Sequence, residues 1–279
     1  MKLLTKKHTN QFINFYLICF VANYCWYFFN GITLSTLNPI FFTNKLDFTI
    51  NFLMLTKIQE LVASSKGFRI VLDLLFFTFP FVLAFVHYKK PKARPVLALA
   101  TSIISLIYAI IIYIFTFSTN GQFIPWVLVP LTFCYFKEEN FSINFNALRY
   151  IFLSMFLSAG LWKLATGAIF HVEEMSAVLL HQHAQILVDG KNNFTTSIIT
   201  FFIAHKVIAY IFYFGAFIAE VSFAIGFFTK KYDKYLAIVL FAFLFLDFIT
   251  MFIYYFSWVV FIGYLYFTKF EKEKSSASI

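Results

Sequence analysis

Charged side chains are scarce in this 279-residue sequence, which has 22 Lys and Arg, 13 Asp and Glu, and therefore only 13% charged residues. A water-soluble domain typically carries about 25% charged and roughly 45–50% apolar residues. Here 61% of the residues are hydrophobic, and the mean hydropathy is +0.79. So few charges cannot cover a folded chain of this size in water. The sequence therefore predicts an integral membrane protein.

Cysteine pairs and alternating strand patterns are also missing. The three cysteines, Cys19, Cys25 and Cys134, show no Cys-x-x-Cys spacing, so they do not indicate a redox compartment. The apolar runs do not alternate in segments of about ten residues, which argues against an outer-membrane barrel. They continue for about 20 residues, the length that a helix needs to cross a bilayer. The expected fold class is all-α, a polytopic transmembrane helical bundle.

Eight apolar runs are candidate membrane spans. They cover residues 11–29, 68–88, 95–117, 122–136, 147–166, 201–228, 235–255 and 256–267. The fourth run is short and contains Pro125 and Pro130, so we expect it to be kinked or partly re-entrant. The last two are continuous, and because one straight helix of that length would exceed a core of about 30 Å, we expect a break at Ser257-Trp258. The prediction is seven or eight spans in a single membrane domain of residues 1–279.

Basic residues gather in short clusters between these runs, so the net charge of +9 indicates topology and not a nucleic-acid partner. The clusters are Lys2, Lys6 and Lys7, then Lys89, Lys90, Lys92 and Arg94, then Lys230, Lys231 and Lys234. Such clusters are retained in the cytoplasm. Eight spans with a cytoplasmic N-terminus place every cluster and the tail 269–279 inside, and leave segments 30–67 and 167–200 outside. The predicted location is the plasma (inner) membrane.

Ionisable residues inside the apolar runs need a reason, because each costs about 2.5–3.5 kcal/mol near the bilayer centre. Apart from Arg69 and His87 at the two ends of the second run, they are Asp73, Arg149, Lys163, His205, Lys206, Glu220 and Asp247. Asp73 and Lys163 lie about 8 and 5 Å below the outer ends of their runs, from a rise of 1.5 Å per residue. His205 and Lys206 enter at a similar height. These four residues are therefore expected to form an outer cluster.

Glu220 and Asp247 form a second, deeper layer in this estimate, and we expect both to line a cavity there. They lie roughly 12 and 18 Å above the inner ends of their runs. A direct ion pair between Glu220 and Lys163 is therefore expected to be too long. Glu220 shares a helical stripe with Lys206, Tyr210, Tyr213 and Phe217. The stripe predicts a cavity wall, and the alternative is a set of helix–helix hydrogen bonds, which the tyrosines favour.

Lys163 is the strongest candidate for chemistry. It follows Ser158-Ala159-Gly160, whose small side chains allow a neighbouring helix to approach closely. Desolvation disfavours an ammonium, so a lysine buried in this way could act as a base near neutral pH, unless Asp73 pairs with it. Asp73 and His205 would orient or tune it. The alternative is that Lys163 snorkels to the outer headgroups.

The outer segment contains a weak metal-binding pattern. As a helix, residues 171–183 would place His171, Glu174 and His181 on one stripe, and His and Glu can bind a metal. No His-Glu-x-x-His motif is present, and Glu174 and His181 are about two turns apart. The expectation is no metal, and a partly exposed amphipathic helix over the mouth of the bundle.

Two stretches resemble the horizontally transferred transmembrane (HTTM) family. Ser158-Ala-Gly-Leu-Trp-Lys-Leu164 is similar to its Ala-Gly-x-x-Lys-Leu motif. Residues 219–228, the basic residues after them and the run 235–267 are similar in order to its C-terminal half. The resemblance covers about residues 145–268, and Asp247 stands near the place where the family often has a histidine.

The resemblance implies a function. The family includes the membrane part of vitamin K-dependent γ-carboxylase and small bacterial proteins that mature the sporulation-delaying toxin. Lys163 falls on the lysine that the carboxylases use to deprotonate vitamin K hydroquinone. The implied cofactor is a reduced quinone of the menaquinone or vitamin K type, drawn from the membrane lipid, and the implied partner is an exported peptide. The alternatives are a non-catalytic assembly, maturation or immunity subunit that binds another membrane protein and, third, a transporter.

Overall fold

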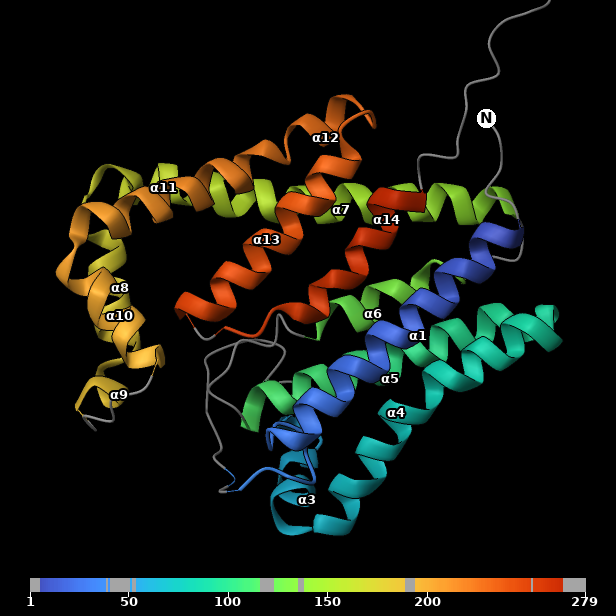
Figure 1. Ribbon diagram of the computed structural model, residues 1–279. Coiled ribbons are helices and arrows are strands. Elements are labelled where there is room, and N and C mark those ends of the chain that lie inside the picture. The colour runs from blue at the N-terminus through green and yellow to red at the C-terminus, as the bar shows by residue number, and fades with distance from the viewer. Residues whose placement is uncertain are drawn as a thin grey trace, which may run out of the picture. The chain divides into compact units, whose positions relative to one another are not determined.

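The computed structural model describes residues 6–38, 40, 51, 54–115, 123–134, 138–188, 194–251 and 253–267 (Figure 1). Every regular element within these ranges is a helix. Lys2, residues 41–50 of the predicted outer loop and the tail 269–279 lie outside them. The all-α prediction is confirmed for the described part of the chain.

Six helical segments are long and apolar enough to cross a membrane. They are α1 (Lys6–Phe29), α4 (Lys66–Lys89), α5 (Arg94–Phe115), α7 (Glu138–Ala165), α11 (Lys206–Ser222) with its short continuation α12 (Ile225–Phe228), and α13 (Asp233–Met251). By length and composition, these segments make the chain a multi-pass membrane protein. Two other predicted runs contain only short helices, α6 (Ile124–Leu131) and α14 (Phe261–Phe267).

Two expected spans have different bounds in the structure. The predicted run 201–228 is interrupted at His205, which separates α10 (Phe194–Ala204) from α11. The run from 235 to 267 does break, as predicted, but α13 already ends at Met251. Ser257 and Trp258 lie in the 3-10 helix η4 (Phe256–Val260), which leads into α14. The first break falls on the polar pair His205-Lys206, whereas the sequence after Met251 stays apolar and gives little sign of the second.

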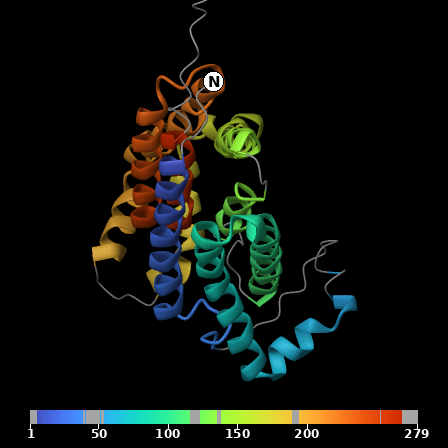
Figure 2. The same ribbon diagram turned by 90° about the vertical axis from the view of Figure 1, so that its right-hand side faces the viewer.

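The chain divides into two compact units, and the boundary falls inside α7. Of the described residues, those up to Leu148 form the first unit and those from Arg149 onward form the second. In the first unit α4 and α5 pack side by side, joined by the 3-10 turn η1 (Pro91–Ala93), and α3 (Ile58–Ser64) leads into α4 (Figure 2). Helices α1 and α6 complete it by packing on α4 and α5, respectively.

Asp73 organises the first unit. Its side chain is buried, and its two carboxylate oxygens accept hydrogen bonds from three donors. The backbone N–H groups of Leu34 and Ser35 donate at 3.2 and 2.8 Å, and the hydroxyl of Tyr108 donates at 2.6 Å. The ring of Tyr108 stacks on Phe76, with centroids 4.1 Å apart. Asp73 therefore holds the chain after α1 against α4 and α5.

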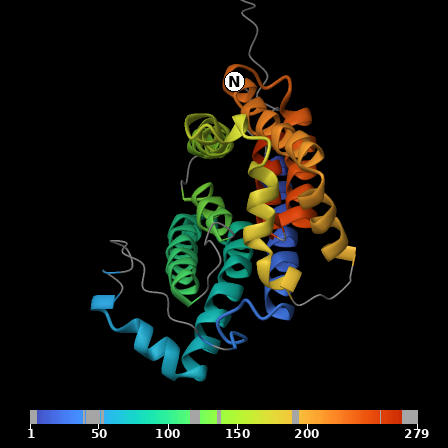
Figure 3. The same cartoon turned by 90° about the vertical axis from the view of Figure 1, so that its left-hand side faces the viewer.

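The second unit contains the remainder of α7 and all later helices. After α7 the chain forms η3 (Ala168–Phe170), α8 (Glu174–Gln182) and α9 (Ala184–Val188) before it reaches α10. Helices α8 and α10 pack on each other and on α11 (Figure 3). Met175, Leu179, Ile199, Phe202 and Ala209 form the buried cluster between them. Helices α13 and α14 pack together and close the unit.

Candidate functional site: an ion pair beside an apolar cavity

Gly160 brings two helices of the second unit into close contact. A Cβ at this position would lie 2.8 Å from Cγ2 of Val221 and 3.3 Å from Cβ of Glu220. Only a residue without a side chain permits this approach of α7 to α11. Gly160 therefore makes the close helix contact that was expected of Ser158-Ala159-Gly160, whereas Ser158 and Ala159 are exposed.

The contact joins Lys163 directly to Glu220. The Lys163 Nζ donates a hydrogen bond to Glu220 Oε1 at 2.7 Å. The side chain of Lys163 is 22% exposed and that of Glu220 is 5% exposed. The expectation that this pair would be too long is therefore wrong, and the two predicted layers meet at one ion pair.

The ends of the helices explain this correction. Lys163 lies about 3 Å from the end of α7, whereas Glu220 lies about 21 Å from the start of α11, at 1.5 Å per residue. The depth estimate from sequence assumed that both helices end at one outer plane. Because the crossing at Gly160 pairs the end of α7 with the later part of α11, that assumption fails.

The ion pair leaves one polar atom without a partner. Glu220 Oε2 is buried, and no hydrogen-bond donor reaches it among the described residues. A buried carboxylate oxygen without a donor is costly, since it has lost water and gained nothing in exchange. A proton on the carboxyl group or a donor from a bound molecule would satisfy it.

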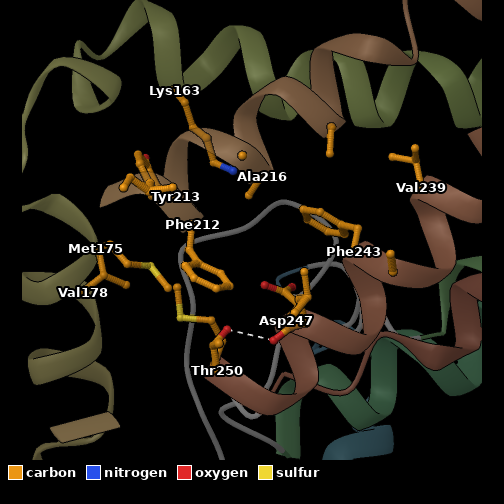
Figure 4. A pocket seen from close by; sticks show the side chains of 16 residues that line it. Lys163, Met175, Val178, Phe212, Tyr213, Ala216, Val239, Phe243, Asp247 and Thr250 are labelled. Carbon is orange, nitrogen blue, oxygen red and sulfur yellow. Dashed lines mark hydrogen bonds between the residues drawn. The ribbon is translucent and has the colours of Figure 1, made fainter. Parts of the chain in front are cut away.

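An apolar cavity of about 660 Å³ adjoins the ion pair. Most of its lining residues come from α11 and α13, and α7 and α8 supply the rest (Figure 4). Lys163 extends into it from α7, and Asp247 approaches from α13 (Figure 4). A Cβ atom added at Gly215 would have no neighbouring atom within 4 Å, so this glycine leaves open space at its part of the wall. The volume is within the range of small-molecule sites, about 300–1,000 Å³.

Tyr213 and Asp247, two of the residues predicted to line a cavity, do so. The Lys163 Nζ lies 5.4 Å from the ring centroid of Tyr213, a cation–π contact. Asp247 is within electrostatic range of both Lys163 and Glu220. The cavity therefore has an apolar wall that carries the ammonium group of Lys163 and the carboxyl group of Asp247, in addition to the Glu220 carboxylate that binds Lys163 beside it.

The other residues of the predicted stripe face elsewhere. The Tyr210 hydroxyl donates to the carbonyl of Ile169 at 2.8 Å, which is the helix-packing role considered as the alternative. Glu220 faces α7, while its neighbour Ala219 lines the cavity. The cavity wall on α11 is the adjacent stripe, which includes Phe212, Gly215 and Ala216.

His205 and Lys206 have local partners at the start of α11. The ring of His205 stacks on Phe201 at 4.4 Å, and its Nδ1 lies 2.9 Å from the Phe201 carbonyl. The Lys206 Nζ donates to Glu173 Oε1 at 2.6 Å. Hydrogen bonding and the positive charge of Lys206 lower the pKa of Glu173. Asp73, the fourth member of the predicted outer cluster, has the partners in the first unit given above.

The three weak metal candidates do not share a site in the described chain. His171 lies before α8, and Glu174 and His181 are at opposite ends of that helix. No group of three or more His, Cys, Asp or Glu that could hold a metal ion occurs among the described residues. Helix α8 instead contributes Met175 and Val178 to the cavity.

A third ion pair, which is fully buried, was also not predicted from the sequence. Arg149 Nε and Nη2 donate to Asp233 Oδ2 and Oδ1 at 3.0 and 2.5 Å, and both side chains are fully buried. Arg149 was identified from the sequence as an ionisable residue inside an apolar run, where it needs a partner, but Asp233 was not identified as that partner. Its position directly after Lys230 and Lys231 resembles that of an ordinary loop charge.

Fold and site together define a multi-pass helical membrane protein with an ion pair at the wall of an apolar cavity. No protein-family profile, curated protein or solved structure matches the chain.

Proposed function

We propose that the cavity binds a reduced quinone from the lipid phase, and that Lys163 serves as the base in modifying or maturing an exported peptide. One observation carries this proposal: the ammonium of Lys163 lines an apolar cavity and pairs with a buried carboxylate whose second oxygen lacks a donor. The proposal adopts the resemblance to the HTTM family, in which the corresponding lysine is such a base.

The residues present fit a ligand of this class. An apolar wall suits a quinone ring, and lining residues such as Ile211, which is 62% exposed, open the cavity towards the lipid. Asp247, which lines the cavity, could accept a hydrogen bond from a ligand hydroxyl. A bound quinol would supply an acidic hydroxyl group.

Lys163 can accept a proton only as the neutral amine. In the ion pair the Nζ holds the proton, and transfer to Glu220 would leave a neutral amine beside a neutral acid. A low-dielectric surrounding favours such a neutral pair over separated charges. Glu220 thus acts as the proton store for Lys163, and Asp247 is a second acid that biases this exchange.

The contact also discriminates between the two classes of function. A partner-binding subunit would have Lys163 directed to lipid headgroups and a groove free of charge. Here Lys163 is held by Glu220 and lines the cavity. The ligand site is therefore the better-supported function.

We also infer eight crossings with a cytoplasmic N-terminus in the plasma membrane. Three long helices, α5, α7 and α11, lie between the basic clusters 89–94 and 230–234. Three crossings would place these clusters on opposite sides, against the charge rule. A fourth crossing in the run 122–136, which contains α6, places both inside, and α14 returns the chain to the cytoplasm. In this topology α7 runs from the cytoplasmic to the extracytoplasmic side, and Lys163 is in its last turn.

Mass spectrometry of lipids that co-purify with the detergent-solubilised protein tests the proposed function. The natural sequence should retain a stoichiometric quinone, and Lys163→Ala and Glu220→Gln should lose most of it. Ile218→Phe is the matched control, because Ile218 is on α11, is exposed and is not among the residues lining the cavity. Equal quinone content in all four proteins, or none in any, would contradict the proposal.

A further inference from the structure

A second cavity adjoins the first on the side of α10. It has a volume of about 360 Å³ and is lined by α10, α11 and α13. Phe212, Leu246 and Thr250 line both cavities and therefore form the partition between them. We call the cavity beside Lys163 the head chamber and the cavity beside α10 the chain chamber.

The two chambers differ in chemistry. Lys163 and Asp247 give the head chamber two ionisable groups. The chain chamber has none, and its remaining wall is formed by Phe194, Ser197, Ile198, Phe201, Phe202 and Ile249. A molecule that fills both chambers must therefore be polar at one end and apolar at the other.

Phe212 is the central element of the partition. Its ring packs edge-on against Phe202 of α10, with centroids 5.1 Å apart. The Phe212 side chain is 43% exposed, so it is not locked in a close-packed core. A chain that crosses the partition would pass along this ring.

We propose that the chain chamber binds the apolar chain of the same amphiphile whose polar head lies beside Lys163. This inference rests on the proposed function and adds the ligand class, a single lipid-phase molecule with a proton-bearing head and a chain long enough to pass Phe212. It also assigns α10 a role, because the break at His205 places this helix beside α11 and creates the second chamber.

Binding of two quinols with the same ring tests the proposal. Dimethoxy-methyl-benzoquinol has no chain, and decylubiquinol adds a decyl chain to that ring. Both compounds should bind the natural protein, and decylubiquinol should bind ~3- to 10-fold more tightly. The gain in affinity is modest because the decyl chain leaves an apolar detergent phase and not water, so only its packing against the chamber wall contributes. The measurement is equilibrium binding to the full-length protein in detergent.

Three variants separate the chambers. Ile198→Phe fills the chain chamber. In this variant the affinity for decylubiquinol should fall to about that for the chainless compound, whose own affinity should not change. Gly215→Leu fills the head chamber and should abolish binding of both compounds. Ile218→Phe adds the same bulk outside both chambers and should change neither.

The failures are distinguishable. If Ile198→Phe keeps the full chain advantage, the chain leaves the head chamber by another route and the chain chamber proposal is wrong, while the proposed function stands. If neither compound binds the natural protein, or if Gly215→Leu binds both normally, the proposed function fails and this inference fails with it.

Discussion

Two ion pairs hold the same helix in the second unit, and they differ in almost every other respect. Arg149 and Lys163 are about 21 Å apart along α7. The Arg149–Asp233 pair is bidentate and fully buried, and neither residue lines either chamber. Its remaining guanidinium nitrogen, Arg149 Nη1, has no hydrogen-bond partner among the described residues. The Lys163–Glu220 pair has one hydrogen bond, a partly exposed lysine and a carboxylate oxygen without a donor. We call Arg149–Asp233, which lies away from both chambers, the closed pair, and Lys163–Glu220, which adjoins the head chamber, the open pair. The closed pair fixes helix positions, whereas the open pair can also interact with a ligand.

The largest expected effect comes from breaking the closed pair. Arg149→Met leaves the Asp233 carboxylate buried without its partner, which should destabilise the protein by about 3–5 kcal/mol. Thermal unfolding in detergent would measure this. The double variant Arg149→Met/Asp233→Leu should recover most of the loss, because it removes both charges. A double variant as unstable as the single one would mean that the pair is not the cause.

The next effect concerns the helix crossing that brings the open pair together. Gly160→Ala places a Cβ against Val221 and Glu220 and should cost about 1–3 kcal/mol by overpacking. Gly215→Ala is the matched control, because its Cβ meets open space and alanine favours the helix by up to ~1 kcal/mol. The measurement is the melting temperature of each variant relative to that of the natural protein. Equal destabilisation by the two variants would contradict the close contact at Gly160.

A smaller loss of stability is expected when the open pair is broken. Glu220→Gln should cost about 1 kcal/mol, because Lys163 is partly exposed and regains solvation more easily than a fully buried charge. Quinol binding should fall much more than stability does. If stability falls as far as in Arg149→Met, the open pair is as structural as the closed one and the contrast between them disappears.

The smallest effect is a pH dependence from His183, at the end of α8. Burial lowers the pKa of His183, against an opposing hydrogen bond with the backbone of Thr250. The unfolded chain therefore takes up a proton near pH 6.5, before the folded chain does, so stability is greatest above that pH and falls on acidification. The melting temperature should decrease slightly between about pH 7.5 and 5.5, and the decrease should be smaller in His183→Asn. An identical decrease in both proteins would exclude His183 as the source.

Sequence alone predicted the features that depend on composition and local spacing. The helical membrane class follows from hydropathy, and the close contact at Gly160 follows from three small residues before Lys163. The Lys163–Glu220 pair could not be predicted, because it depends on how far α11 extends beyond the end of α7. The chain chamber was also not predicted, since His205 and Lys206 were assigned to a polar cluster inside one span and not to a turn between two helices.

Site-resolved labelling of lysines with an amine reagent, with and without saturating dimethoxy-methyl-benzoquinol, tests most directly whether the open pair is a ligand site. Lys206 is the internal control, because its side chain is 53% exposed and pairs with Glu173, which is 71% exposed. We predict that the quinol protects Lys163 from labelling and leaves Lys206 unchanged. Unchanged labelling of Lys163 in the presence of bound quinol would show that the ligand lies elsewhere, and would contradict the assignment of this cavity.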